Sequence, residues 1–167
     1  MSLKVDIRKL DLFNKISKEG GRRVADSLRQ MTGLDTEIKL SKLNFLHIDD
    51  VKTHLGDEKQ VGIHVELTES PYGYVLFLLD PAESKKLAQL MIPGEGSDES
   101  SGFSDMERSA IQEIGNIMTS GYIDGWANVL DTTIDISTPS FIYGPASDIV
   151  DEMGGWPEED IAFVVDS

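Results

Sequence analysis

The sequence contains no cysteine, which excludes disulfide bonds, thiolate catalysis and cysteine-ligated zinc sites. Basic residues are almost absent from its second half: residues 94–167 hold Arg108 alone against 16 acidic residues, whereas residues 1–93 hold 14 of each sign. No apolar run approaches the roughly 20 residues that a membrane-spanning helix needs, and residues 1–10 lack a signal-peptide pattern. These absences predict a cytoplasmic protein that binds neither nucleic acid nor membranes.

The 167 residues carry a net charge of −15, and 40% of them are hydrophobic. A chain of this length and composition is expected to fold as one domain with its own core. Its acidic residues are scattered over every surface segment rather than gathered in one tail. This distribution favours a halophilic source, where dense salt screens self-repulsion, over a dedicated basic partner.

Helical spacing of apolar residues predicts a helix over 8–31, with Gly33 as its C-cap, although Gly20 and Gly21 interrupt it. Strands are predicted at 36–48, 60–69 and 72–80, and the last should be central in a sheet because it is apolar on both faces. A helix over 82–92 ends this first half, residues 1–93, and the polar segment 94–103 reads as a linker.

A second long helix is predicted from Ser104 to about Val129, because Ser104 and Glu107 form a capping box at its start. Strands are expected at 132–143 and 160–166, with a Gly/Pro-rich insert between them. The second half, 104–167, thus repeats the order of the first but stops one strand and one helix earlier, as if truncated. The resulting expectation is an α+β fold with a pseudo-two-fold repeat of helix–strand–strand–strand–helix units.

Three polar residues of the second long helix form one narrow row. At about 100° per residue, Ser109, Glu113 and Asn116 fall near 0°, 40° and −20°. Met106, Ala110, Ile114, Ile117 and Gly121 fall at about 60–140° and predict a buried stripe beside the row. A carboxylate can pair with a cation, and an amide can hold a water by donating and accepting. A solvated helix face is the simpler interpretation of the same pattern.

Gly115 lies beside Asn116 in the middle of this helix, where glycine costs about 1 kcal/mol relative to alanine. Either a partner's backbone approaches the helix here, or the helix packs closely against a strand. The sequence leaves both open.

Glu113-Ile-Gly-Asn-Ile-Met118, preceded by Ser109, resembles the signature of the CheC/CheX/FliY chemotaxis phosphatases. The resemblance covers nearly the whole chain and is strongest to CheC. It implies a mostly antiparallel sheet with two long motif helices on one face. It also implies hydrolysis of the aspartyl phosphate on the response regulator CheY, with Glu113 and Asn116 as catalytic residues and Ser109 as an auxiliary one.

The first half provides a second, degenerate copy of the row. An offset of 98 residues maps Ser109, Glu113 and Asn116 onto Asp11, Lys15 and Lys18. Two ammonium groups cannot accept a hydrogen bond from a partner lysine or orient a water as an amide does. One working site is therefore predicted, not two. The surplus of basic residues over 1–29 suggests either a dock for an acidic partner or an ordinary amphipathic helix.

The resemblance implies no cofactor or metal of the protein's own, because the Mg²⁺ would belong to phosphorylated CheY. An alternative function is a non-catalytic adaptor that binds CheY or the receptor deamidase CheD, and another is a flagellar switch component. The assembly is expected to be a monomer or a homodimer. His47, His54 and His64 have no metal-ligand spacing.

Overall fold

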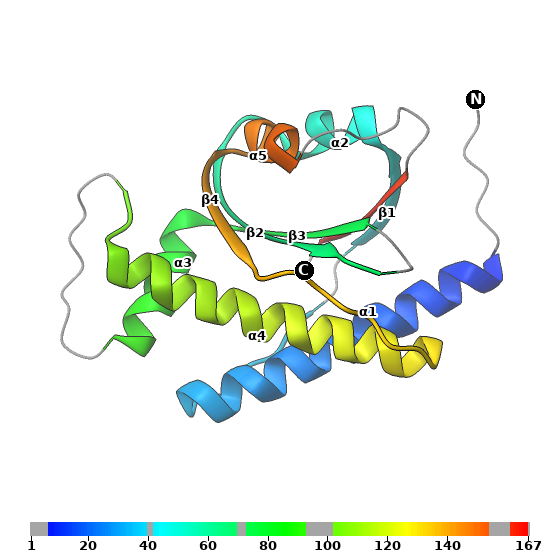
Figure 1. Ribbon diagram of the computed structural model, residues 1–167, viewed down its shortest axis with the longest axis horizontal. Helices are drawn as coiled ribbons and strands as arrows, with labels where there is room; N and C mark the ends of the chain where they lie inside the picture. Colours follow the sequence, from blue (N-terminus) through cyan, green and yellow to red (C-terminus); the bar gives the residue numbers. More distant parts are fainter. Residues whose placement is uncertain (1–6, 40–41, 70–72, 93–101, 154–160, 167) are drawn as a thin grey trace.

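Antiparallel strands occupy the middle of the molecule, and helices cover both of their faces (Figure 1). The computed structural model describes residues 7–39, 42–69, 73–92, 102–153 and 161–166. In chain order, the elements are α1 (Ile7–Thr32), β1 (Lys42–His47), α2 (Ile48–Leu55), β2 (Lys59–Leu67), β3 (Gly73–Leu79), α3 (Pro81–Met91), α4 (Asp105–Leu130), β4 (Ser140–Pro145), α5 (Ala146–Met153) and β5 (Ile161–Asp166).

The two halves of the chain exchange strands. β2 lies between β3 and β4 in a three-stranded sheet, and β1 pairs with β5; all three pairings are antiparallel. In each of the β1–β5 and β2–β4 pairs, one strand comes from each half. Neither half of the described chain can therefore complete its strand pairing alone.

The predicted pseudo-two-fold repeat is confirmed by the element bounds. Adding 98 to the bounds of α1, β1 and α2 gives the bounds of α4, β4 and α5. Burial repeats with the same offset: Ile16 and Val24 are buried in α1, and so are their counterparts Ile114 and Tyr122 in α4. Each unit also contains a short helix after its first strand, which the sequence analysis missed.

Some predicted strands differ from the observed ones. Residues 34–39 are irregular, and 132–139 contribute only an isolated bridge between Leu67 and Ile136. The segments after the strands, predicted as loop or insert, form α2 and α5. The predicted linker 94–103 lies outside the described residues except for 102–103, so the proposed division of the chain stays a prediction.

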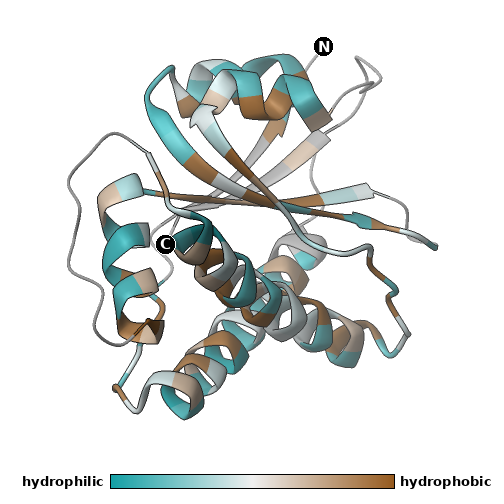
Figure 2. Ribbon diagram, turned by 60° about the vertical axis from the view of Figure 1, so that its left-hand side comes forward, coloured by the Kyte–Doolittle hydropathy of each residue, from teal (hydrophilic) through white to brown (hydrophobic). Residues whose placement is uncertain are grey.

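The prediction that β3 is central was wrong: among the described strands it is an edge of its sheet. Its two apolar faces have another cause, which is a helical layer on each side of the sheet. Phe77 packs with the clusters around α1 and α4, whereas Leu76 lies beside Ile149 of α5 at the opposite face, next to Gly62. Figure 2 shows the mixed colouring of these helices, as expected for elements with one buried face.

The long helices α1 and α4 lie against each other on one face of the strands, as predicted (Figure 1). They approach closely at glycines. A Cβ atom on Gly125 would lie 2.9 Å from the backbone nitrogen of Gly20, and one on Gly20 would lie 2.3 Å from the Tyr122 ring. The Gly20-Gly21 pair that interrupts the helical pattern therefore marks a helix crossing, not a break.

Candidate functional site

Helix α4 begins at a fully formed capping box. The Glu107 backbone N–H donates to Ser104 Oγ at 3.1 Å, and the Ser104 backbone N–H donates to Glu107 Oε1 at 3.0 Å. Asp105 and Glu107 place negative charge in the first turn, where the helix dipole is favourable to it. The helix start is therefore fixed one turn before Ser109.

The buried face of α4 holds the helix rigidly against the rest of the molecule. Ile111 and Ile114 are each 1% exposed, and Ala110 packs in the same core with Val61 and Ile63 of β2. A Cβ on Gly115 would lie 2.5 Å from Cγ2 of Ile63. Gly115 is thus explained by packing against a strand, and the interpretation that it admits a partner's backbone is wrong.

Ser109, Glu113 and Asn116 all lie on the exposed face of α4. Side chains three and four residues apart on a helix are neighbours, with Cβ atoms about 5–6 Å apart. Within the described part of the chain, none of these three side chains makes a hydrogen bond or an ion pair. The row therefore presents a carboxylate and an amide whose hydrogen-bonding groups are available to a partner.

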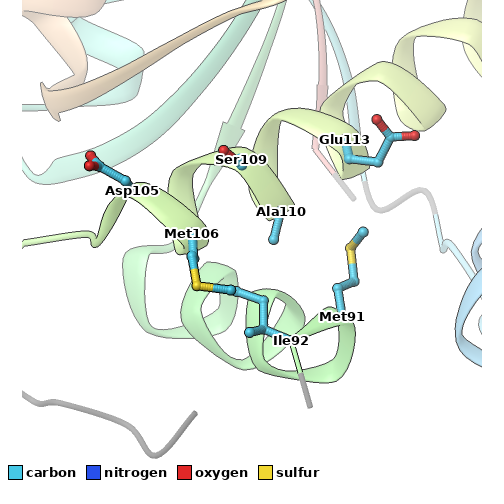
Figure 3. Close-up of a pocket in the computed structure, with 7 residues that line it drawn as sticks. All are labelled: Met91, Ile92, Asp105, Met106, Ser109, Ala110 and Glu113. Carbon is cyan, nitrogen blue, oxygen red and sulfur yellow. The ribbon is translucent and has the colours of Figure 1, made fainter. Parts of the chain in front are cut away.

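A pocket of about 420 Å³ adjoins the row, between the end of α3 and the first turns of α4 (Figure 3). It is wide open to solvent. Its lining is mostly apolar, and Asp105, Ser109 and Glu113 are its polar members; the full set is Met91, Ile92, Asp105, Met106, Ser109, Ala110 and Glu113. Asn116 does not line it. Two residues of the predicted catalytic row thus also border a pocket that the sequence analysis did not find.

Met106 is the residue whose environment was predicted wrongly. Its helical angle placed it in the buried stripe, yet it is 53% exposed. The buried stripe begins at Ala110, which is 8% exposed, and Met106 lines an open pocket with Met91 and Ile92 instead of packing in the core. Met106 lies in the first turn and at the edge of the expected stripe. This position was the one sequence feature that indicated partial exposure at the start of α4.

The degenerate row on α1 is exposed in the same way. Asp11, Lys15 and Lys18 all face solvent, and Lys15 Nζ lies 3.2 Å from an Asp11 carboxylate oxygen. The two rows are not brought together, because α1 and α4 run antiparallel. Gly20, two residues from Lys18, meets Gly125, which is roughly 13 Å beyond Asn116 along the α4 axis.

Most cations of α1 are neutralised within the helix, which favours the amphipathic interpretation over the acidic dock. Arg22 and Arg23 both donate to the Glu19 carboxylate, at 2.7 and 3.1 Å. These hydrogen bonds lower the pKa of Glu19, and the same carboxylate raises the pKa of Arg22. Arg29 pairs with Asp26.

No group of three or more potential metal ligands gathers among the residues that the structure describes. The three histidines lie apart, on β1, α2 and β2. None of the helices in the described ranges is long and apolar enough to cross a membrane.

The fold is shared with solved structures of FliY, the FliM middle domain and the chemotaxis protein CheX. FliY of Thermotoga maritima matches with a TM-score of 0.76 at 22% identity, over 98% of this chain and 86% of that one. The FliM middle domain of Helicobacter pylori matches with a TM-score of 0.74 at 14% identity, over 96% of this chain and 83% of that one. CheX of Vibrio vulnificus matches with a TM-score of 0.54 at 20% identity, over 81% of this chain and 76% of that one. At these identities the likeness shows the fold alone.

Sequence comparison is more specific. Residues 106–143, which include the whole row, match the CheC-like family. CheC1 of Halobacterium salinarum is 48% identical to this chain over all 167 residues, and the match covers 85% of that protein. Its name proposes it as a CheY-P phosphatase. The chain therefore belongs to the CheC-like family. The halophilic source of this relative fits the acidic composition.

Proposed function

We propose that this protein is a cytoplasmic chemotaxis phosphatase that hydrolyses the aspartyl phosphate of a CheY response regulator. The observation that carries the proposal is the row on α4, in which Glu113 and Asn116 are exposed, adjacent and without a partner among the described residues. The name of the 48% identical relative supports the same activity.

An aspartyl phosphate is a reactive mixed anhydride, so its hydrolysis needs a correctly placed water more than a new nucleophile. Asn116 enters the regulator's active site, where its amide carbonyl and N–H group orient one water toward phosphorus. The water forms the new P–O bond as the bond to the regulator's aspartate oxygen breaks. The products are inorganic phosphate and a free carboxylate.

Glu113 fixes the docking angle by pairing with a lysine of the regulator. Because a rigid helix separates the carboxylate from the amide, this ion pair also fixes where Asn116 lies. Ser109 acts as an auxiliary hydrogen-bond partner at the edge of the contact. No metal is assigned to this protein itself; a Mg²⁺ held by the regulator would supply the positive charge beside the phosphoryl oxygens.

The test follows the decay of phosphorylated CheY with the wild-type protein and with the variants Glu113→Ala and Asn116→Ala. Misplacing a reacting water by about 1 Å costs on the order of 100-fold in rate. We expect losses of that size for Asn116→Ala and somewhat smaller ones for Glu113→Ala.

Lys15→Ala and Lys18→Ala are matched controls, because they also replace an exposed side chain by alanine at the equivalent positions of α1. Both should keep wild-type rates. Equal decay with all four variants would contradict the proposal. It would instead favour the adaptor function, for which Asn116 is dispensable and binding of CheY or CheD is the activity.

A further inference from the structure

We propose that the pocket between α3 and α4 receives an apolar side chain of the docking response regulator, next to a basic residue of that regulator. This inference rests on the proposed function and concerns how the same site recognises its partner. It assigns a role in partner recognition to Met106, a residue that is not part of the row.

The pocket is continuous with the row. Ser109 and Glu113 belong to both, so a regulator that pairs with Glu113 lies next to the pocket. Figure 3 shows Met106 and Ala110 on the side of α4 that faces Met91 and Ile92, while the Glu113 carboxylate points away from these two residues. Contact with the row and contact with the pocket therefore belong to one surface.

The pocket suits a protruding side chain. Its 420 Å³ lie near the lower end of the range for small-molecule sites, and it is open instead of enclosing. Met91 and Met106 line it, and methionine is an unbranched, polarisable side chain that adapts to the shape of a partner. Met106, about half exposed, has apolar surface left to bury.

Two other occupants fit less well. The chain's own segment 93–101, which joins α3 to α4, has no apolar side chain beyond Pro93. A second copy of the chain would bring the same charge of −15 to a rim that already holds Asp105 and Glu113. These two carboxylates favour a cation beside the apolar side chain.

The acidic composition fits a high-salt environment, in which apolar contact gains importance relative to charge. At about 1 M salt the Debye length is about 3 Å, so charges steer and hold partners only at contact distance. Apolar contact does not suffer this screening. A pocket beside the catalytic row thus supplies affinity that the acidic surface cannot.

The experiment measures kcat and KM for Met106→Glu with phosphorylated CheY of Halobacterium salinarum, in molar KCl. Pocket contacts are present before and during the reaction, so their loss weakens binding without changing the chemical step. We expect KM to rise about tenfold and kcat to stay within twofold of wild type. Met106→Leu should behave like wild type.

Asn128→Glu is the matched control, because it adds the same charge at an exposed position far along α4. If Met106→Glu fails to fold, as judged by circular dichroism, the uncharged Met106→Gln takes its place. A KM for Met106→Glu equal to that of Asn128→Glu, while Asn116→Ala still lowers turnover about 100-fold, would overturn the pocket proposal and leave the proposed function intact. If Asn116→Ala is fully active, the pocket proposal and the proposed function both fail.

Light scattering tests a second copy as the occupant. If the wild-type protein is a dimer and Met106→Glu is a monomer, the pocket belongs to a second copy, and the proposal is also overturned.

Discussion

The amide of Asn116 and the carboxylate of Glu113 divide the proposed work between orientation and docking. Both are held by a helix whose opposite face is buried, and neither has a competing partner among the described residues. At the equivalent positions of α1, Lys15 and Lys18 offer only donors, and Lys15 is already paired with Asp11. The proposed difference in activity between the two rows thus rests on two side chains.

Asn116→Asp separates the role of the amide from that of side-chain size. Aspartate keeps the shape but loses the N–H donor and brings a negative charge toward the phosphoryl group. We expect turnover to fall about 100-fold, as much as for Asn116→Ala, with a higher KM from charge repulsion. Steady-state kinetics of CheY dephosphorylation check this. An Asn116→Asp enzyme with half the wild-type kcat would rule out a need for the amide donor.

Helix α4 is positioned by tight packing, and Gly115 lies directly against Ile63 of the sheet. A methyl group in Gly115→Ala meets Ile63 at 2.5 Å. Overpacking costs about 1–3 kcal/mol, while alanine recovers about 1 kcal/mol of helix propensity. We expect a net loss of about 1 kcal/mol and a Tm about 2–4 °C lower.

Gln112→Ala, at an exposed neighbouring position, controls for introducing an alanine into this part of α4 without a core contact. Its free energy of unfolding should stay within about 0.5 kcal/mol of wild type. A Gly115→Ala protein that is more stable than wild type and has lost phosphatase activity would point to close approach of a partner instead of core packing.

The long elements were predictable from the sequence because each carries enough periodic residues to define a face. The capping box gave the start of α4, and the offset of 98 gave the repeat. α2 and α5 were not predictable: eight residues give little periodicity, and His47 makes no side-chain cap at the start of α2. They are held by packing of Val51, Ile149 and their neighbours, which only the assembled fold reveals.

The proposed catalytic row and the pocket differ in how far the sequence could predict them. Ser109, Glu113 and Asn116 lie on one helix, so their spacing alone predicted a shared face. The pocket needs α3 and α4 side by side, although segment 93–103 separates them in sequence. No periodicity within either helix contains that information, which is why Met91, Ile92 and Met106 were found only in the structure.

At the scale of the whole molecule, the net charge of −15 dominates. Self-repulsion destabilises a compact state of high net charge, and salt screens it. If screening recovers about 2–3 kcal/mol, the Tm should rise by roughly 5–10 °C between 0.1 and 2 M KCl. Calorimetry at several salt concentrations measures it. A Tm that does not change, or that falls, would contradict a chain adapted to high salt.

The two-fold repeat makes the molecule its own control, because equivalent exposed positions on α1 and α4 differ in chemistry and not in fold. The central claim is that Asn116 on α4 is responsible for turnover. It is tested most directly by single-turnover decay of phosphorylated CheY at saturating concentrations of Asn116→Ala and of Lys18→Ala. The account predicts about 1% of the wild-type rate for the first variant and a rate within twofold of wild type for the second. Equal rates for the two variants would contradict it.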